Sequence, residues 1–393
     1  RALQAYAGTF EREMQRMLAQ KLGRASFHTE PHLCGDTMRG TRVEGNSVWD
    51  SRNRWVTVHG TQYLVVRDNV GYGSVGHGFF LEDGTEVFTV LDRNLAVQAY
   101  RGKPLPNQAL PGDKNEGAGF WWANSLNAFT RNVAVECDEY GFRYEATPAA
   151  GVKVGKETFG EPGKAFDLTL PVRRPDGTTA RVDVRTLPFV RFDGNEAHSM
   201  HNYGLNLGVG AGGVGPPAAA PFVIRDLLVW HNRLGYRPAV PHVRVETARL
   251  ANNTYGIYLP EYVGHDYHGV TWEPVDGVAP RVRRMPGDQT PGDGRGTPKP
   301  PDVEVTKLDP VDDLPPTTVV TAVRAAGGKL VVRGTTADNG AVRRVTVNGV
   351  AATPVDGTRG EWAAEVPAAA AVTAHAEDDA GNVERTPHVV AVP

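Results

Sequence analysis

A motif of roughly twenty residues recurs through the first two thirds of the chain, and this repeat constrains the fold more than any other feature. Each copy contains an apolar residue, a small polar residue, a short turn, and then Gly, apolar, any, apolar. Segment 43–59 fits the pattern with Trp55 in the Gly position. The other copies are VRDNVGYGSVGHGFFLE (66–82), TRNVAVECDEYGFRYE (130–145), RFDGNEAHSMHNYGLNL (191–207), IRDLLVWHNRLGYRP (224–238) and VETARLANNTYGIYL (245–259).

Small polar residues stand nine positions before the Gly position and suit an inward-facing ladder. Such side chains can satisfy the backbone groups of a turn from inside the fold. The Gly positions at Trp55 and Gly78 are 23 residues apart, and those at Gly235 and Gly256 are 21 apart. This period predicts a solenoid of stacked coils, a right-handed parallel β-helix. The expected ladder residues are Asn46, Asn69, Asn132, Asn195, Asp226 and Thr247.

The chain divides into three parts, because 393 residues exceed what one hydrophobic core usually serves. The predicted β-helix covers residues 1–285. Residues 286–314 form a linker rich in Pro, Gly and Asp. Residues 315–393 contain short alternating strands with DNG, NG and AGN turns, which predict a β-sandwich that resembles the immunoglobulin-like modules of bacterial secreted proteins. We expect loops inserted between rungs near 100–117, 147–189 and 208–221.

Charge and hydropathy exclude several classes of partner. The formal net charge of −3 gives no electrostatic reason to expect nucleic acid. No apolar run approaches the ~18–20 residues that span a bilayer, so we expect no membrane-spanning segment. We also expect a monomer. Cys34 and Cys137 do not settle the redox compartment, because one disulfide and two buried thiols fit equally well.

The repeat also predicts which side chains meet on the outer surface. Side chains alternate between core and solvent along a strand, and rungs stack at ~4.8 Å. Glu82 therefore lies above His59 within hydrogen-bonding reach. The same column extends to His32 before His59 and to Glu145 about two rungs after Glu82. The adjacent outward column is predicted to contain Thr57, Phe80, Trp121, Arg143 and Asn206.

Carboxylates, aromatic rings and an arginine on one face suit a long acidic sugar polymer. Aromatic faces stack on sugar rings, Arg pairs with uronate carboxylates, and paired acids cleave glycosidic bonds. Two other interpretations stay open: an inserted loop covers the aromatic residues, or the histidines are ordinary surface residues. The candidate catalytic residues are His59, Glu82, His32 and Glu145, and the candidate substrate-binding residues are Phe80, Trp121, Arg143, Asn124 and His77.

Two metal sites are further candidates, although the sequence requires no cofactor. His28, His32 and His59 are donors of the kind that bind a transition metal. Asp83 and Asp92 flank the turn at Gly84 and offer the oxygen ligands that calcium prefers.

Four segments carry a resemblance to a known family: KLGRASFHTEPHLCGD, WVTVHGTQYLVVRDNVGYGSVGHGFFLEDG, FWWANSLNAFTRNVAVE and FVRFDGNEAHSMHNYGL. They are similar to the β-helix region of the cell-migration-inducing hyaluronan-binding proteins and transmembrane hyaluronidases, a region shared by bacterial secreted relatives. The resemblance covers residues 20–275. The first histidine motif reads HTEPH, with two residues more than the His-any-His of the family.

This resemblance implies a right-handed parallel β-helix that acts outside the cell, either secreted or at the cell surface. It implies an acidic polymer of the glycosaminoglycan type, hyaluronan in the animal members, that is bound and cleaved within the chain. Calcium dependence is associated with the animal enzymes. The residues that match the family one by one are His32, His59, Asp68, His77, Glu82 and Asp83.

Three functions are compatible with these residues. A hydrolase would use Glu82 as the proton donor, with Glu145 or a histidine-activated water opposite. A lyase would need a base at the uronate C5 and a cation that neutralises the uronate carboxylate, for which Arg143 and calcium are candidates. A binding protein or adhesin needs no catalyst. We favour hydrolysis.

Overall fold

The computed structural model describes most of the chain from residue 41 onward. The predicted metal ligands His28 and His32, together with Cys34, lie outside the described residues. The described residues are 41–104, 109–110, 112–148, 152–154, 157–159, 166–174, 178–208, 214–258, 263–273, 312, 315–338, 340–355, 357 and 359–392.

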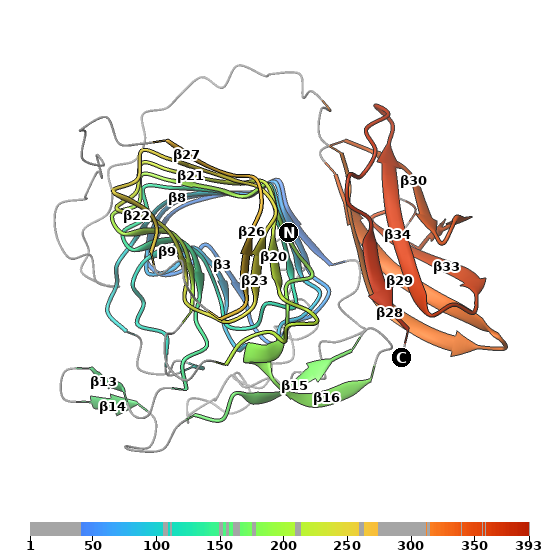
Figure 1. Cartoon of the computed structure of the whole chain (residues 1–393), viewed down its shortest axis with the longest axis horizontal. Helices are drawn as coiled ribbons and strands as arrows, with labels where there is room; N and C mark the ends of the chain where they lie inside the picture. Colours follow the sequence, from blue (N-terminus) through green and yellow to red (C-terminus); the bar gives the residue numbers. More distant parts are fainter. Residues whose placement is uncertain are drawn as a thin grey trace, which may run out of the picture.

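Three long parallel sheets form the walls of a β-helix, and Figure 1 looks along their stacked rungs. Consecutive strands of the chain pass from the first sheet to the second and the third. The first sheet contains β1 (Arg42–Glu44), β4 (Val65–Arg67), β7 (Val90–Asp92), β10 (Ala128–Thr130) and β17 (Arg191–Asp193). The second contains β2 (Ser47–Ser51), β5 (Val70–Val75), β8 (Leu95–Tyr100), β11 (Val133–Val135), β18 (Glu196–His198), β21 (Leu227–Trp230), β24 (Ala248–Ala251) and β27 (Val270–Glu273).

The third sheet carries the candidate site. It contains β3 (Val56–Val58), β6 (Phe79–Leu81), β9 (Ala118–Trp122), β12 (Tyr140–Tyr144), β19 (Tyr203–Leu207), β22 (Leu234–Pro238) and β25 (Tyr255–Ile257). A shorter parallel sheet of β20 (Phe222–Ile224), β23 (Val243–Val245) and β26 (His265–Tyr267) closes the last rungs. The predicted all-β fold with a parallel β-helix is therefore confirmed.

Insertions leave the rungs where the sequence predicts loops. The insertion after β12 forms two antiparallel hairpins, β13 (Val152–Val154) with β14 (Glu157–Phe159) and β15 (Thr169–Arg173) with β16 (Thr179–Asp183). A short 3-10 helix, η3 (Val184–Thr186), returns the chain to the next rung. Within the described residues, no helix has the length and apolar character to cross a membrane.

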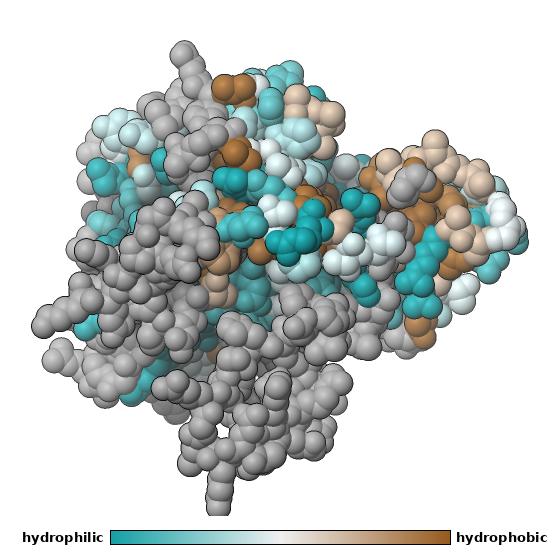
Figure 2. Space-filling view, turned by 90° about the horizontal axis from the view of Figure 1, so that it is seen from below, coloured by the Kyte–Doolittle hydropathy of each residue, from teal (hydrophilic) through white to brown (hydrophobic). Residues whose placement is uncertain are grey.

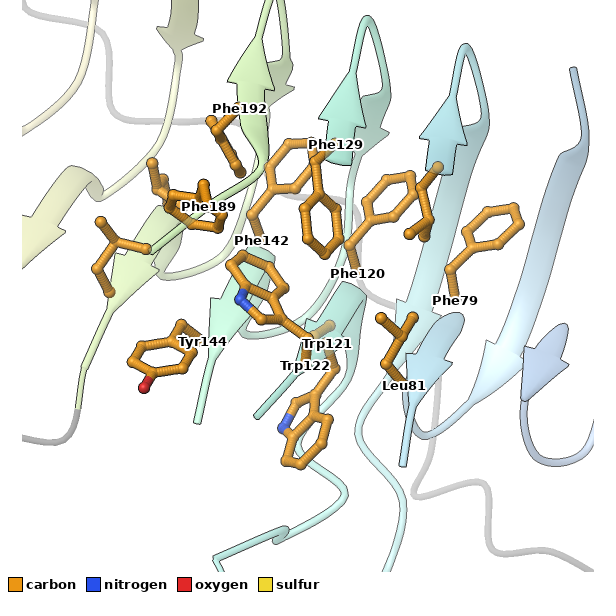
Figure 3. Packing of buried hydrophobic residues seen from close by; sticks show 14 of the residues in the cluster. Phe79, Leu81, Phe120, Trp121, Trp122, Phe129, Phe142, Tyr144, Phe189 and Phe192 are labelled. Carbon is orange, nitrogen blue, oxygen red and sulfur yellow. The ribbon is translucent and has the colours of Figure 1, made fainter. Parts of the chain in front are cut away.

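Aromatic residues stack along the inside of the third sheet. Phe79, Phe120 and Phe142 occupy equivalent positions on β6, β9 and β12. Their ring centroids are 5.0 Å and 4.8 Å apart, with nearly parallel planes. Figure 3 shows the three rings in a row. Stacked rings of this kind add to the burial of their apolar surface, so the repeat fixes the rungs against one another.

A ladder of asparagines lines the turn between the first and second sheets. The amide Nδ2 of each residue donates to Oδ1 of the next, at 3.0 Å, 2.9 Å, 2.9 Å and 3.1 Å. Each Oδ1 also accepts the backbone N–H of the preceding ladder residue, at 3.0–3.2 Å. The side chains thus satisfy the turn from inside, as the sequence predicts. The ladder runs through Asn46, Asn69, Asn94, Asn132 and Asn195.

The ladder corrects the sequence alignment in two places. Asn94 belongs to it, and LDRN at 91–94 is the missed match to VRDN at 66–69. It was missed because this rung has the insertion near 100–117 before its Gly-containing strand. Asp226 and Thr247 are exposed and lie outside the ladder. In the later rungs, Asn232 and Asn253 form a second pair, with their side chains 2.9 Å apart.

The C-terminal strands form a sandwich of two antiparallel sheets around one hydrophobic core. One sheet contains β28 (Thr317–Ala326), β29 (Lys329–Ala337), β33 (Glu361–Pro367) and β32 (Thr353–Pro354). The other contains β31 (Val350–Ala351), β30 (Val342–Val347), β34 (Ala371–Asp378) and β35 (His388–Ala391). The immunoglobulin-like affiliation and the domain boundaries stay predictions.

The sandwich docks beside the first sheet of the β-helix (Figure 1). Val319 and Ala337 of the sandwich pack in one buried cluster with Val65, Val90 and Ala128 of that sheet. The interface between the two units therefore contains a buried apolar cluster.

On the outer face seen in Figure 2, the described parts of both units show hydrophilic and hydrophobic residues intermixed.

Removal of a ladder residue should cost more inside the stack than at its end. Asn132 makes four ladder hydrogen bonds besides a bond to the Leu91 carbonyl, so Asn132→Ala leaves several buried backbone groups unsatisfied. We expect a loss of about 3 kcal/mol in the free energy of unfolding. Asn46→Ala at the partly exposed end of the described ladder should cost about 1 kcal/mol or less. Urea unfolding followed by circular dichroism measures both, and equal losses would contradict a cooperative ladder.

Candidate functional site

His59 and Glu82 lie on neighbouring rungs, as the repeat predicts. Their strands β3 and β6 pair in parallel, and the Glu82 N–H donates to the Val58 carbonyl at 3.0 Å. His59 Nδ1 lies 3.4 Å from a Glu82 carboxylate oxygen and 2.9 Å from one of Asp83. The three side chains are 21%, 25% and 18% exposed. One imidazole thus meets two carboxylates at the edge of the solvent.

Glu86 connects the two turns that carry this cluster. Its Oε1 accepts the N–H groups of Gly60 and Asp83, both at 3.0 Å, and so joins the turns that follow β3 and β6. Its carboxyl group is buried, and burial together with the nearby Asp83 raises the pKa of Glu86 to about 8. Glu86 is therefore protonated at neutral pH. The sequence reasoning missed it, although EDGTE at 82–86 places three acids within five residues.

The second predicted column is also present in the register of the third sheet. Thr57 pairs with Phe80, Phe80 with Trp121, Trp121 with Arg143, and Arg143 with Asn206. These side chains are not exposed, however. Phe80 is only 3% exposed and Trp121 only 2%. The expectation that this column forms an open platform therefore needs correction.

The covering element is the inserted segment around Asp113. The Asp113 carboxylate accepts from Arg54 Nη2 at 3.2 Å and lies 2.8 Å from His77 Nε2. The Arg54 guanidinium sits 4.2 Å over the ring of Phe80, and His77 stacks on Phe80 and Trp121 with centroids 5.4 Å and 5.5 Å away. Arg54 and His77, which bind Asp113 of the inserted segment, thus lie against the aromatic rings, in line with the covered alternative that the sequence left open.

The charges under this cover are balanced. Burial lowers the pKa of His77, against the opposing effect of Asp113. Burial alone would raise the pKa of Asp113, but His77 and Arg54 together hold it below its usual value. Asp113 is therefore an ionised carboxylate that neutralises Arg54. His77 lies between the Asp113 carboxylate and the rings of Phe80 and Trp121, and so helps to hold the inserted segment in place.

Glu145, Arg143 and Asn124 have buried partners of their own. Arg143 forms an ion pair with Glu145 and donates to the Gly208 carbonyl at 3.0 Å. Glu145 also accepts the Thr147 hydroxyl. Asn124 donates to the Gly84 carbonyl at 3.1 Å and so fastens the turn beside the His59 cluster. The structure brings Glu145 into the same column as Glu82 but not to an open surface.

The predicted metal residues are not assembled within the described part of the chain. Asp83 follows β6 of the third sheet, whereas Asp92 ends β7 of the first. The Asp92 carboxylate is buried and pairs with Arg131 Nη2 at 2.9 Å. The set of His28, His32 and His59 stays a prediction, because its first two members lie outside the described residues. Asp68, a family match, pairs with Arg93 at 2.8 Å on the opposite side of the rung from the third sheet.

Comparison with known proteins gives one family and several relatives. The family model described as CEMIP beta-helix matches residues 8–205. The human cell surface hyaluronidase CEMIP2 is 28% identical over 256 residues, which are 58% of this chain and 16% of the relative. Fibrocystin-L from Mus musculus is 28% identical over 220 residues, 55% of this chain and 4% of the relative.

A third relative is the human cell migration-inducing and hyaluronan-binding protein, which is 33% identical over 155 residues, 33% of this chain and 11% of the relative. The chain thus spans at most 16% of the length of these three proteins. The match to the family model spans the His59 and Glu82 turns.

The protonated state of Glu86 predicts a pH dependence of stability. The folded chain keeps a proton up to a pH of about 8 that the unfolded chain releases near 4.5. The free energy of unfolding should therefore lose this contribution as the pH rises from 4.5 to 8. Glu86→Gln, which resembles the protonated carboxyl group, should become progressively more stable than the wild type across this window.

Thermal unfolding at successive pH values measures this effect. Glu82→Gln is the matched control, because that carboxylate is partly exposed and lacks the two backbone donors of Glu86. A constant difference between Glu86→Gln and the wild type from pH 4.5 to 8 would show that Glu86 is ionised.

Proposed function

Because the chain belongs to the CEMIP β-helix family, we propose that it binds and hydrolyses an acidic polysaccharide of the hyaluronan or glycosaminoglycan type outside the cell. The printed names of two relatives, a cell surface hyaluronidase and a hyaluronan-binding protein, support this substrate class. The observation that carries the proposal is the contact of the partly exposed His59 with Glu82 and Asp83.

The two carboxylates give His59 a defined proton arrangement. The Asp83 carboxylate, 2.9 Å from Nδ1, favours a proton on that nitrogen and so one tautomer of the ring. The Asp83 carboxylate stabilises positive charge that develops on the ring during proton transfer. Glu86 keeps the two turns at a fixed separation without adding another negative charge at neutral pH. The cluster can therefore move a proton to a leaving glycosidic oxygen or from an attacking water.

Glu82 is the proposed acid in this scheme, and its geometry favours a histidine-activated water as its counterpart. The alternative counterpart, Glu145, is buried and paired with Arg143. Residue Gly112 of the covering insertion lies against the Glu145 side chain. A sugar would reach Glu145 only if this insertion moved, whereas it reaches the His59 cluster directly.

In this arrangement Arg143 is not available for the role that a lyase would need. β-Elimination requires a cation on the uronate carboxylate, and the Arg143 guanidinium already serves Glu145 and the Gly208 carbonyl. A non-catalytic binding function has its own support in the printed name of the hyaluronan-binding relative. Binding without cleavage is therefore the second candidate function.

One assay separates the three outcomes. The protein is incubated with hyaluronan and with chondroitin, and polymer size, reducing ends and unsaturated-uronate absorbance are followed. Shortened polymer with new reducing ends and no absorbance is the result expected for hydrolysis. Absorbance would indicate elimination, and retention of intact polymer would indicate binding alone. The proposal would be overturned if no polymer were retained and none were shortened.

Two substitutions test the assignment of the site. His59→Ala and Glu82→Gln should each lower the hydrolysis rate at least ~100-fold, because each removes a proton-transfer group. The fold should be retained, since both side chains lie at the surface. His268→Ala is the matched control, a largely exposed histidine in the last described rungs whose ion pair with Asp266 lies far along the chain from the cluster. Full activity in both site variants would move the site elsewhere.

A further inference from the structure

Three aspartates converge in the sandwich, away from the candidate site. Asp312 precedes β28, Asp338 directly follows β29, and Asp378 is the last residue of β34. One carboxylate oxygen from each lies within 4.8 Å of the others. Asp338 and Asp378 are buried, and neither forms a salt bridge with a Lys or Arg of the described residues. The three aspartates thus place like charges close together, with Arg93 as a nearby opposite charge.

The hydrogen bonds of Asp338 and Asp378 to the described residues leave one oxygen of Asp338 unused. Both carboxylate oxygens of Asp378 accept from Asn382, at 2.7 Å from the backbone N–H and 2.8 Å from Nδ2. The Asp338 Oδ2 accepts the Gly340 N–H at 3.0 Å. The Asp338 Oδ1 is buried and has no hydrogen-bond partner among the described residues, in a residue that is only 2% exposed. A buried acceptor of this kind is costly unless another group satisfies it.

The electrostatics agree with this geometry. Burial raises the pKa of Asp338 to about 6; the neighbouring Asp312 and Asp378 add to the shift, and Arg93 opposes it. The Asp312 carboxylate lies close to the backbone of Gly340, because a side chain in place of Gly340 would overlap it.

We propose that Asp312, Asp338 and Asp378 bind a calcium ion. Calcium takes oxygen ligands at 2.3–2.6 Å, so two ligands of one ion are at most about 5 Å apart. The three carboxylate oxygens, which all lie within 4.8 Å of one another, meet this requirement. The donor set contains only oxygen, which suits calcium and not the nitrogen- and sulfur-binding metals. The ion would satisfy the unpartnered Oδ1 and offset the three charges.

The position of the site indicates what the ion would do. Asp338 comes from one sheet of the sandwich and Asp378 from the other, while Asp312 belongs to the segment that enters the sandwich. The Asp338 carbonyl accepts from Arg67 Nη1 of β4 in the β-helix at 2.9 Å. Its neighbour Ala337 packs in the buried cluster between the two units. Calcium would therefore clamp both sheets of the sandwich and support its junction with the β-helix.

Calcium titration of the full chain by calorimetry tests this site. We expect one ion per chain and an unfolding temperature that is higher by about 5 °C in excess calcium than in chelator. In Asp338→Asn the calcium affinity should fall at least ~10-fold and the thermal shift should disappear. Without calcium, this variant should be more stable than the wild type, because the substitution removes a buried charge among like charges.

Controls separate the site from general ionic effects. Asp379→Asn changes an exposed neighbour of Asp378 outside the three aspartates and should keep the full calcium response. Sodium chloride at matched ionic strength should not reproduce the shift. If Asp338→Asn does not fold, Asp312→Asn at the partly buried ligand gives the same comparison. No calcium binding in the wild type, or an unchanged calcium response in both site variants, would overturn the proposal.

Discussion

Parallel stacking of rungs at the ordinary strand spacing is the constraint on which the rest of this protein depends. Each residue lies directly beneath its counterpart in the next rung, so the side chains at equivalent positions must be able to stack on one another. The asparagine ladder solves this for the buried turn, because one amide both donates to and accepts from its neighbours. The row of Phe79, Phe120 and Phe142 solves it for the core.

The same stacking assembles the candidate site. His59 and Glu82 are 23 residues apart in the chain but adjacent in space, because they leave paired strands at the same point of successive rungs. The candidate site thus lies at the turn where the third sheet ends. The flat face of that sheet, with Phe80 and Trp121, is covered and acts as a packing surface for the inserted segment.

Buried carboxylates recur throughout the molecule, and the structure stabilises them in different ways. Asp92 pairs with Arg131, and Asp113 lies between Arg54 and His77. Glu86 retains its proton and binds two backbone N–H groups. The Asp338 Oδ1 has no hydrogen-bond partner among the described residues, and it is there that we propose a calcium ion. The difference follows from which partners lie within reach, because every buried charge must be paired, protonated or bound to a metal.

The sequence by itself determined the β-helix, the ladder residues Asn46, Asn69, Asn132 and Asn195, and the neighbours His59 and Glu82, because all of these follow from a local period and strand alternation. It did not reveal the cover over Phe80, the role of Glu86, or the meeting of Asp312 with Asp338 and Asp378. These depend on where insertions and distant segments fold back, and no periodic pattern encodes that path. Tertiary structure alone decided which outward side chains reach solvent, since burial there is set by contacts between residues such as Arg54 and Asp113, 59 positions apart.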